Sequence, residues 1–205
     1  VIDDYDKTNI GSPMPKFTFG WTNTFRYKNF DLSVFINGSY GNKVYNYLSM
    51  KLTHMNSPWT NQLNAVNGRA QLVPINPNKV YEDGTMWYND VSNVMVANPG
   101  ASIPRATIND PNDNDRISDR YIEDGSYIRL KNISLGYTFP KKTIDKLGLS
   151  NLRIYANIQN LLTITGYDGY DPEIGASTSS VNVYGLDNGR YPSPTVYSFG
   201  LNVSF

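Results

Sequence analysis

The last eleven residues of this chain, 195–205, alternate strictly between apolar and small or polar side chains. In a β-strand the two sets would lie on opposite faces, because successive side chains point to opposite sides. The apolar set is Tyr197, Phe199, Leu201, Val203 and Phe205. A strand of about ten residues that is apolar on one face is long enough to cross a bilayer at a tilt. This segment therefore indicates a transmembrane β-barrel.

Two earlier segments show the same alternation and predict a β-hairpin. Residues 16–27 and 30–40 carry aromatic and aliphatic side chains at most alternate positions, opposite mainly polar or small residues. Lys28 and Asn29 separate them, which is the spacing of a tight two-residue turn. Both segments are long enough to cross a bilayer.

Alternation resumes at Tyr127 and predicts two more strands. The first runs to Phe139 before Pro140, and the second covers 152–163. A short basic connector with one helical turn is expected between them. With the last segment the chain has five predicted strands, so the sequence predicts an all-β fold, namely part of a transmembrane antiparallel β-barrel.

The connections between these strands differ sharply in length. Two are short, whereas 41–125 and 165–193 are long and rich in polar and aromatic residues. The longer one is expected to be functional or a small domain of its own, with short helical turns near 43–55 and 87–96. Outer-membrane barrels have short periplasmic turns and long extracellular loops. Both long loops are therefore predicted to be extracellular, and the carboxyl terminus periplasmic.

Composition excludes several kinds of site and partner. Eighteen Lys and Arg balance eighteen Asp and Glu, so nothing in the charge points to nucleic acid. The chain has no cysteine, which excludes disulfides and thiolate metal sites. His54 is the only histidine, so neither an ordinary zinc site nor a catalytic triad is expected. No apolar run is long enough for a transmembrane helix.

Five strands are too few to close a barrel. The smallest barrels use about eight strands, and lipid tolerates no unpaired sheet edge. The opening residues Val1–Tyr5 do not form a signal peptide. We therefore expect this chain to be part of a longer one that supplies the remaining strands.

Three segments carry a more specific resemblance. They read EDGSYIRLKNISLGYTFP over 123–140, LRIYANIQNLL over 152–162 and GYDGYDPE over 166–173. In this order, and followed by the terminal strand, they resemble the carboxyl-terminal region of SusC/RagA-type TonB-dependent outer-membrane transporters. The hairpin at 16–40 is similar to the strand pair that precedes them in that family.

The resemblance implies a barrel of about 22 strands, of which residues 1–205 would form about the last five, without the plug domain. It implies import of glycan or peptide fragments through the outer membrane, in contact with its lipid. It also implies two partners, a SusD-like surface lipoprotein and the TonB complex, the latter through an amino-terminal region absent from this sequence. No catalytic residue and no cofactor are expected.

Aromatic and acidic side chains of the long loops are the candidate substrate-binding residues. Such rings stack on sugars, and carboxylates accept hydrogen bonds from hydroxyls. The alternative is structural, with tyrosines at the membrane interface, Asp-Pro setting a turn and the tryptophans forming a small loop core. The candidates are Trp59, Trp87, Tyr88, Tyr167, Tyr170 and Asp171, with Asp168 and Glu173 beside them.

Residues 110–115 partly match the pattern of a calcium-binding loop. Asp110, Asn112 and Asn114 offer oxygens at alternate positions, as a calcium loop does. The EF-hand pattern requires Gly and Glu at its sixth and twelfth positions, where this chain has Asp115 and Tyr121. A solvated turn without metal is therefore expected.

Two other functions remain open at this stage. One is a soluble or surface-attached β-rich carbohydrate-binding module, which aromatic and Asn-rich loops would suit equally well. The other is an outer-membrane hydrolase, because paired carboxylates can cleave glycosidic bonds, although a single histidine fits that class poorly. If the barrel prediction is right, the polar strand faces line its lumen, including Arg26, Asp31, Arg153 and Gln159.

Overall fold

The computed structural model describes residues 3–110, 112–173 and 183–205. The chain divides into two compact units. We call residues 9–46 and 122–205 the sheet unit, and residues 47–121 with the segment before Asn9 the loop unit.

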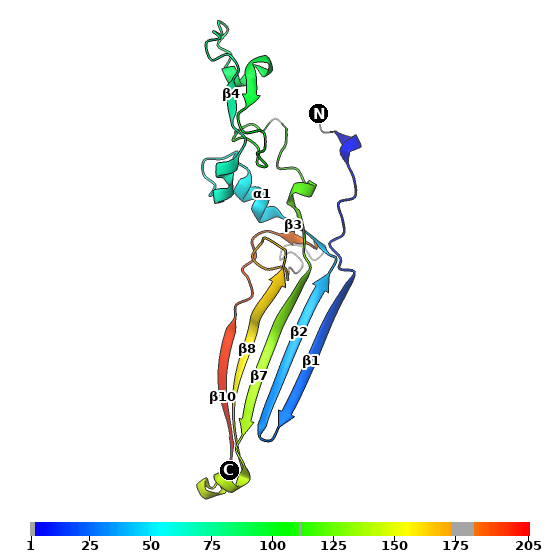
Figure 1. Cartoon of the computed structure of the whole chain (residues 1–205), viewed down its shortest axis with the longest axis vertical. Helices are drawn as coiled ribbons and strands as arrows, with labels where there is room; N and C mark the ends of the chain where they lie inside the picture. Colours follow the sequence, from blue (N-terminus) through cyan, green and yellow to red (C-terminus); the bar gives the residue numbers. More distant parts are fainter. Residues whose placement is uncertain (1–2, 111, 174–182) are drawn as a thin grey trace. The chain divides into compact units, whose positions relative to one another are not determined.

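The sheet unit is built on one five-stranded antiparallel sheet (Figure 1). Its order is β1-β2-β7-β8-β10, so every predicted strand is present and neighbours in sequence are neighbours in the sheet. Within the described residues, β1 pairs only with β2, and β10 only with β8. The strands are β1 (Phe17–Tyr27), β2 (Phe30–Tyr40), β7 (Tyr127–Thr138), β8 (Asn151–Thr165) and β10 (Val196–Ser204).

Register keeps the apolar residues of all five strands on one face. One row across the sheet joins, in order, Phe25, Leu32, Leu135, Ala156 and Phe199. The next row lies on the opposite face and runs through Arg26, Asp31, Gly136, Tyr155 and Gly200. Large side chains of the apolar face are open to the surroundings, with Trp21 58% and Phe199 84% exposed. The sheet therefore has one apolar and one polar face, and the described residues of the sheet unit leave the large side chains of the apolar face open.

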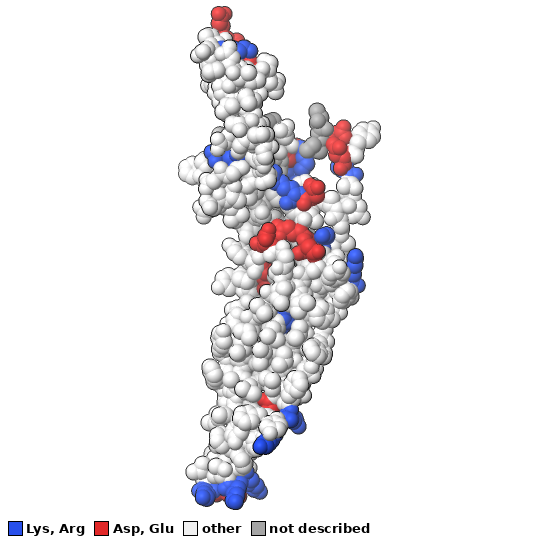
Figure 2. All heavy atoms as spheres, in the orientation of Figure 1, with Lys and Arg blue, Asp and Glu red and all other residues white. Residues whose placement is uncertain are grey.

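Short connections close one end of the sheet. Lys28, at φ 52°, takes the left-handed conformation that the two-residue β1–β2 turn requires. Between β7 and β8, α2 (Lys141–Ile144) and a 3-10 turn (Asp145–Leu147) supply the predicted helical turn, which ends at Gly148 with φ 68°. Figure 2 shows Lys and Arg side chains gathered at this end of the sheet, with few charges along the strands in view.

A β-bulge interrupts β7 where Lys131 stands. Leu130 pairs with Leu162 but Asn132 pairs with Gln159, so Lys131 opposes Asn160 and Leu161 without a regular partner. Asn160 takes a left-handed conformation there, at φ 52°. Arg129 and Lys131, two positions apart on β7, both bond the Glu173 carboxylate.

The other end of the sheet unit carries a second, small sheet with order β6-β3-β9. Its β3–β9 pair is parallel, which brings residues 186–187 beside 45–46. Val44 is almost fully buried there. These strands are β3 (Lys43–Asn46), β6 (Ile122–Asp124) and β9 (Leu186–Asp187).

The loop unit is a small compact body with a modest core. The sequence allowed 41–125 to be a small domain of its own. Met50, Ile103 and Tyr121 are its buried apolar residues among those described. The helical turns predicted near 43–55 and 87–96 are present but shorter, because strand residues flank them at β3 and β5. Its elements are α1 (Tyr47–Thr53), β4 (Leu72–Pro74), β5 (Val94–Val96) and 3-10 turns at Asp4–Asp6, Asn64–Gly68, Trp87–Asn89, Val91–Asn93 and Asp119–Tyr121. None of the described helices has the length and apolar character to span a membrane.

Candidate functional site

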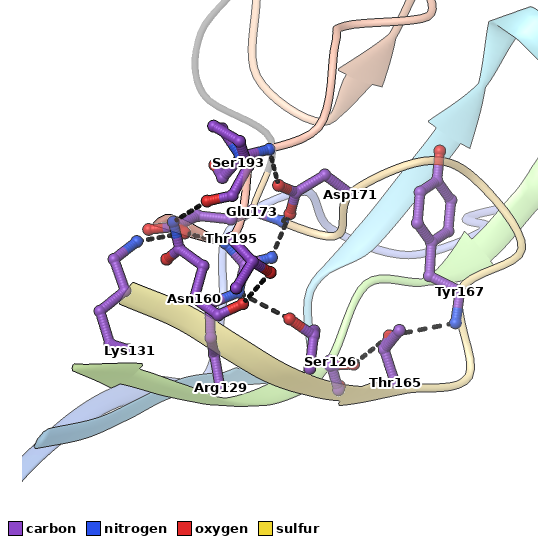
Figure 3. Close-up of polar contacts among 12 residues, drawn as sticks. Ser126, Arg129, Lys131, Asn160, Thr165, Tyr167, Asp171, Glu173, Ser193 and Thr195 are labelled. Atoms are coloured by element: carbon purple, nitrogen blue, oxygen red, sulfur yellow. Dashed lines mark hydrogen bonds and ion pairs between the residues drawn. The ribbon is translucent and has the colours of Figure 1, made fainter. Parts of the chain in front are cut away.

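An ion cluster joins the end of loop 165–173 to the polar face of β7 (Figure 3). Arg129 donates through Nη2 to Asp171 at 2.5 Å and through Nη1 to Glu173 at 2.6 Å. Its Nε donates to Thr163 Oγ1 at 2.8 Å. Lys131 adds a second cation on Glu173 at 2.6 Å. The positive and negative charges balance, so this buried guanidinium is fully compensated.

Asp171 is the centre of this cluster and is 8% exposed. Its oxygens accept the backbone N–H groups of Glu173 and Ser193, each at 2.9 Å, besides the Arg129 guanidinium. Burial disfavours its charge, but these hydrogen bonds and the charge of Arg129 outweigh burial and lower the pKa of the Asp171 carboxyl. Asp171 therefore stays ionised and holds both ends of the second long loop against the sheet.

Tyr167 occupies a neighbouring buried position and is 5% exposed. Its hydroxyl donates to Asp187 Oδ2 at 2.6 Å, while Asp187 Oδ1 accepts the N–H of Gly189 at 2.9 Å. Burial and the carboxylate beside it raise the pKa of the Tyr167 hydroxyl. The Tyr167 hydroxyl and the Asp187 carboxylate are thus hydrogen-bonded within the protein. Tyr170, by contrast, is 63% exposed, with its ring open to a ligand.

The loop unit holds a cavity of about 870 Å³. Trp87 and Tyr88 line it and contact each other edge to face, with ring centroids 5.7 Å apart. Arg69 and Arg105 face the same space, together with amide and hydroxyl groups. This volume is within the range of small-molecule sites. Its lining is Arg69, Ala70, Gln71, Leu72, Trp87, Tyr88, Asn89, Arg105, Ala106, Thr107, Ile108 and Asn109.

The structure separates the other sequence candidates from this cavity. Trp59 lies elsewhere in the loop unit and is 93% exposed, so it is not part of a loop core. Trp87 is half-buried, and Tyr88 is exposed. Of the six candidates, only Trp87 and Tyr88 share a cavity, whereas Tyr167 and Asp171 are buried in the sheet unit.

The described residues of the loop at 110–115 form a hydrogen-bonded turn in which Asn112, Asp113 and Asp115 are exposed, as expected for a solvated turn. The Asp110 carboxylate accepts two hydrogen bonds from Asn114, one from its backbone N–H and one from its side-chain amide, each at 2.6 Å. His54 Nε2 lies 3.0 Å from Asp110 Oδ2, and both side chains are nearly buried. Burial works against the charge of Asp110, yet these bonds prevail and lower its pKa. Across residues 3–110, 112–173 and 183–205, no three His, Cys, Asp or Glu side chains are grouped to hold a metal ion.

Polar residues predicted to face a lumen do share the polar face of the sheet. Arg153 reaches across from β8 to Asp31 on β2, donating through Nη2 at 2.6 Å and through Nε at 3.2 Å. Arg26 stands opposite Asp31 in register, and Gln159 lies further along β8. The Arg153–Asp31 ion pair is partly exposed, so it contributes little to stability, but it holds the two side chains in place.

Sequence reasoning did not single out four of the charged residues that build these sites. Arg129 and Lys131 were visible as cations inside a predicted strand, which is a signal for a buried partner. Arg69 and Arg105 carry no such signal, because only folding of the loop unit brings them beside Trp87.

Comparison with curated sequences finds relatives along the entire chain. It is 35% identical over 209 residues to TonB-dependent receptor P3 of Formosa agariphila, and 28% identical over 208 residues to TonB-dependent receptor SusC of Bacteroides thetaiotaomicron. Each alignment covers 100% of this chain but only 18% and 17% of the relative. The chain therefore spans less than a fifth of these receptors. No family model matches.

Solved structures share its fold. The structure of the RagAB peptide transporter superposes with a TM-score of 0.69 at 21% identity, covering 95% of this chain and 18% of that one. The 'open-open' state of the RagAB peptide importer gives 0.64 at 20% identity, with the same coverage.

Proposed function

Because the chain belongs to the SusC/RagA group of TonB-dependent receptors, we propose that residues 1–205 form part of the barrel wall and outer loops of an outer-membrane importer. The observation that carries this proposal is the five-stranded sheet with one open apolar face and one polar face. Lipid on one side and a watery lumen on the other would match these faces.

The edges of the sheet support the same arrangement. The outer backbone groups of β1 and β10 have no strand partner among the described residues. In lipid such edges would have to pair with further strands of a closed barrel, of about 22 strands in transporters of this kind. In a water-soluble binding module, the same apolar face would stand in water, which disfavours that alternative.

The long loops are proposed to face outward and to bind cargo. Trp87 and Tyr88 would contact a glycan or peptide fragment in their cavity, whereas the exposed Trp59 and Tyr170 remain separate candidates outside it. Tyr167 and Asp171 would act indirectly, by holding loop 165–193 in place. In this proposal a SusD-like lipoprotein delivers the cargo, and the TonB complex supplies energy through parts of the receptor outside this chain. RagAB is described as a peptide transporter, so peptides as well as glycans are candidate cargo.

Uptake in a host strain tests the proposal. The gene is deleted and replaced by the full-length receptor, either wild type or with Trp87→Ala and Tyr88→Ala, and uptake of labelled oligosaccharides and peptides is measured. We expect the deletion to abolish uptake of one cargo class and the double variant to lower it about tenfold or more.

A matched control separates binding from assembly. Trp21→Ala removes an equally large aromatic ring from the apolar face of β1, away from the cavity. At equal amounts of receptor in the outer membrane, this variant should transport normally. Unchanged uptake in the deletion strain would contradict the importer function.

A further inference from the structure

The cavity beside Trp87 and Tyr88 carries two cations that pair with no acid among the described residues. Arg69 and Arg105 line it, and none of the lining residues is acidic. Among the described residues, neither guanidinium pairs with a carboxylate, and the side chain of Arg69 makes only a long bond to the carbonyl of Val66, at 3.4 Å.

Several other cations of the described residues pair with carboxylates, although the half-buried Arg116 bonds backbone carbonyls instead. Arg129 pairs with Asp171 and Glu173, and Arg153 pairs with Asp31. Within the loop unit itself, Lys79 contacts Asp90 at 2.6 Å. A guanidinium that is partly desolvated without a partner is costly. The two arginines of the cavity therefore suit an anion that comes from outside the chain.

Hydrogen bonds fix the walls of this cavity before any ligand binds. The Ala70 N–H donates to the carbonyl of Ile103 at 2.8 Å, and Asn98 bonds both the Arg69 carbonyl and the Gln71 N–H. On the other side, Asn89 closes the turn that carries Trp87, through a 2.9 Å bond to Met86. A site held in this way loses little entropy on binding.

We infer that this cavity binds an acidic oligosaccharide. A guanidinium matches a carboxylate with two parallel hydrogen bonds and matches a sulfate in the same way. The Trp87 and Tyr88 rings offer apolar surface for a sugar ring, and Gln71, Asn89 and Thr107 offer partners for hydroxyls. This inference rests on the proposed import function and names the chemical class of its cargo.

Titration calorimetry on the purified full-length receptor tests it. The probes are an oligogalacturonate, the matching neutral oligogalactoside, a sulfated oligogalactoside and an acidic peptide of similar length. We expect wild type to bind the carboxylated or sulfated sugar at least about tenfold more tightly than the neutral one, with affinity falling as salt is raised. Equal affinity for acidic and neutral sugars would overturn the inference, and so would preference for the acidic peptide.

Variants locate the effect. Arg69→Gln and Arg105→Gln should each weaken binding of the acidic sugar about tenfold and leave the neutral sugar within about twofold. Arg120→Gln removes the same charge from an exposed site of the loop unit that does not line the cavity, and should change nothing. Circular dichroism checks that each variant is folded.

The two proposals fail in different ways. If the arginine variants bind the acidic sugar normally while Trp87→Ala and Tyr88→Ala bind it weakly, the cavity holds cargo without reading its charge, and only this inference is lost. If all four variants bind and transport like wild type, the cargo role of the cavity is lost as well.

Discussion

At the scale of single residues, Arg129 shows how this chain places a charge inside a sheet. Its side chain is 3% exposed and bonds two carboxylates and one hydroxyl. A buried ion pair adds little stability compared with apolar residues of the same size, but removing one partner leaves the other buried and uncompensated. The cluster therefore attaches loop 165–193 to the sheet, and its loss should destabilise the attachment of that loop.

Replacing Arg129 with Met tests this role. We expect the free energy of local opening to fall by roughly 3 kcal/mol, because Asp171 would remain buried without its cation. Hydrogen exchange of the full-length receptor, followed in peptides over 163–173 and 183–193, measures the change. Arg153→Met breaks a comparable ion pair near the other end of the same polar face and should leave both peptides unaffected. Equal protection in Arg129→Met and wild type would contradict the assignment.

The same cluster predicts how acid affects the loop. The folded-state pKa of Asp171 is lowered below its unfolded value by its hydrogen bonds and Arg129, against the effect of burial. The stability that it contributes is therefore complete above the unfolded pKa and is lost as pH falls through the folded pKa. Exchange protection factors over 163–173 should decrease as pH falls below 3.8, the ordinary pKa of an aspartate. In Asp171→Asn this decrease should be much smaller, and an undiminished decrease would assign it to other groups.

At the scale of elements, the long strands could be predicted because apolar residues gather on one face of the sheet and polar residues on the other. Residues 30–40 and 196–204 therefore alternate with period two, and their boundaries agree with the sequence to within a few residues. The bulge at Lys131 could not be predicted, because it depends on Asn160 and Leu161 in the strand opposite. The parallel β3–β9 pair was also missed, since about 140 residues separate its partners and local pattern carries no such information.

Two adjacent positions of β2 test the faces that this alternation assigns. Leu32 lies on the apolar face and Ser33 on the polar face, and both are half-buried in the structure. The chain has no cysteine, so Leu32→Cys and Ser33→Cys can be labelled singly in a full-length receptor freed of any other cysteine. A polarity-sensitive fluorophore should report hydrocarbon at position 32 and water at position 33. Collisional quenchers dissolved in lipid should act on position 32 alone, and equal quenching would exclude a lipid-facing sheet.

At the scale of the whole molecule, the family and the five-stranded antiparallel sheet could be predicted from strand pattern and motifs, whereas the cavity could not. Trp87 and Tyr88 were candidates because large rings can stack on a ligand, and the structure places both at one cavity. Their arginine neighbours come from segments 18 and 17 residues away in sequence, since Arg69 precedes Trp87 and Arg105 follows Tyr88. Only the fold of the loop unit joins them. Chemistry that depends on such contacts has no local signature.

The number of strands between two connections determines whether they lie on the same side of the membrane or on opposite sides. If the loop unit is extracellular, the β7–β8 connection must be periplasmic, because an odd number of crossings separates the two. Thr60→Cys and Lys142→Cys place a thiol at an exposed residue of each. In intact cells, a membrane-impermeant maleimide should label position 60 and spare position 142, whereas both should react after the outer membrane is permeabilised. Labelling of position 142 in intact cells would reverse the orientation, and the loop-unit cavity would then face the periplasm, where it could not capture cargo from outside.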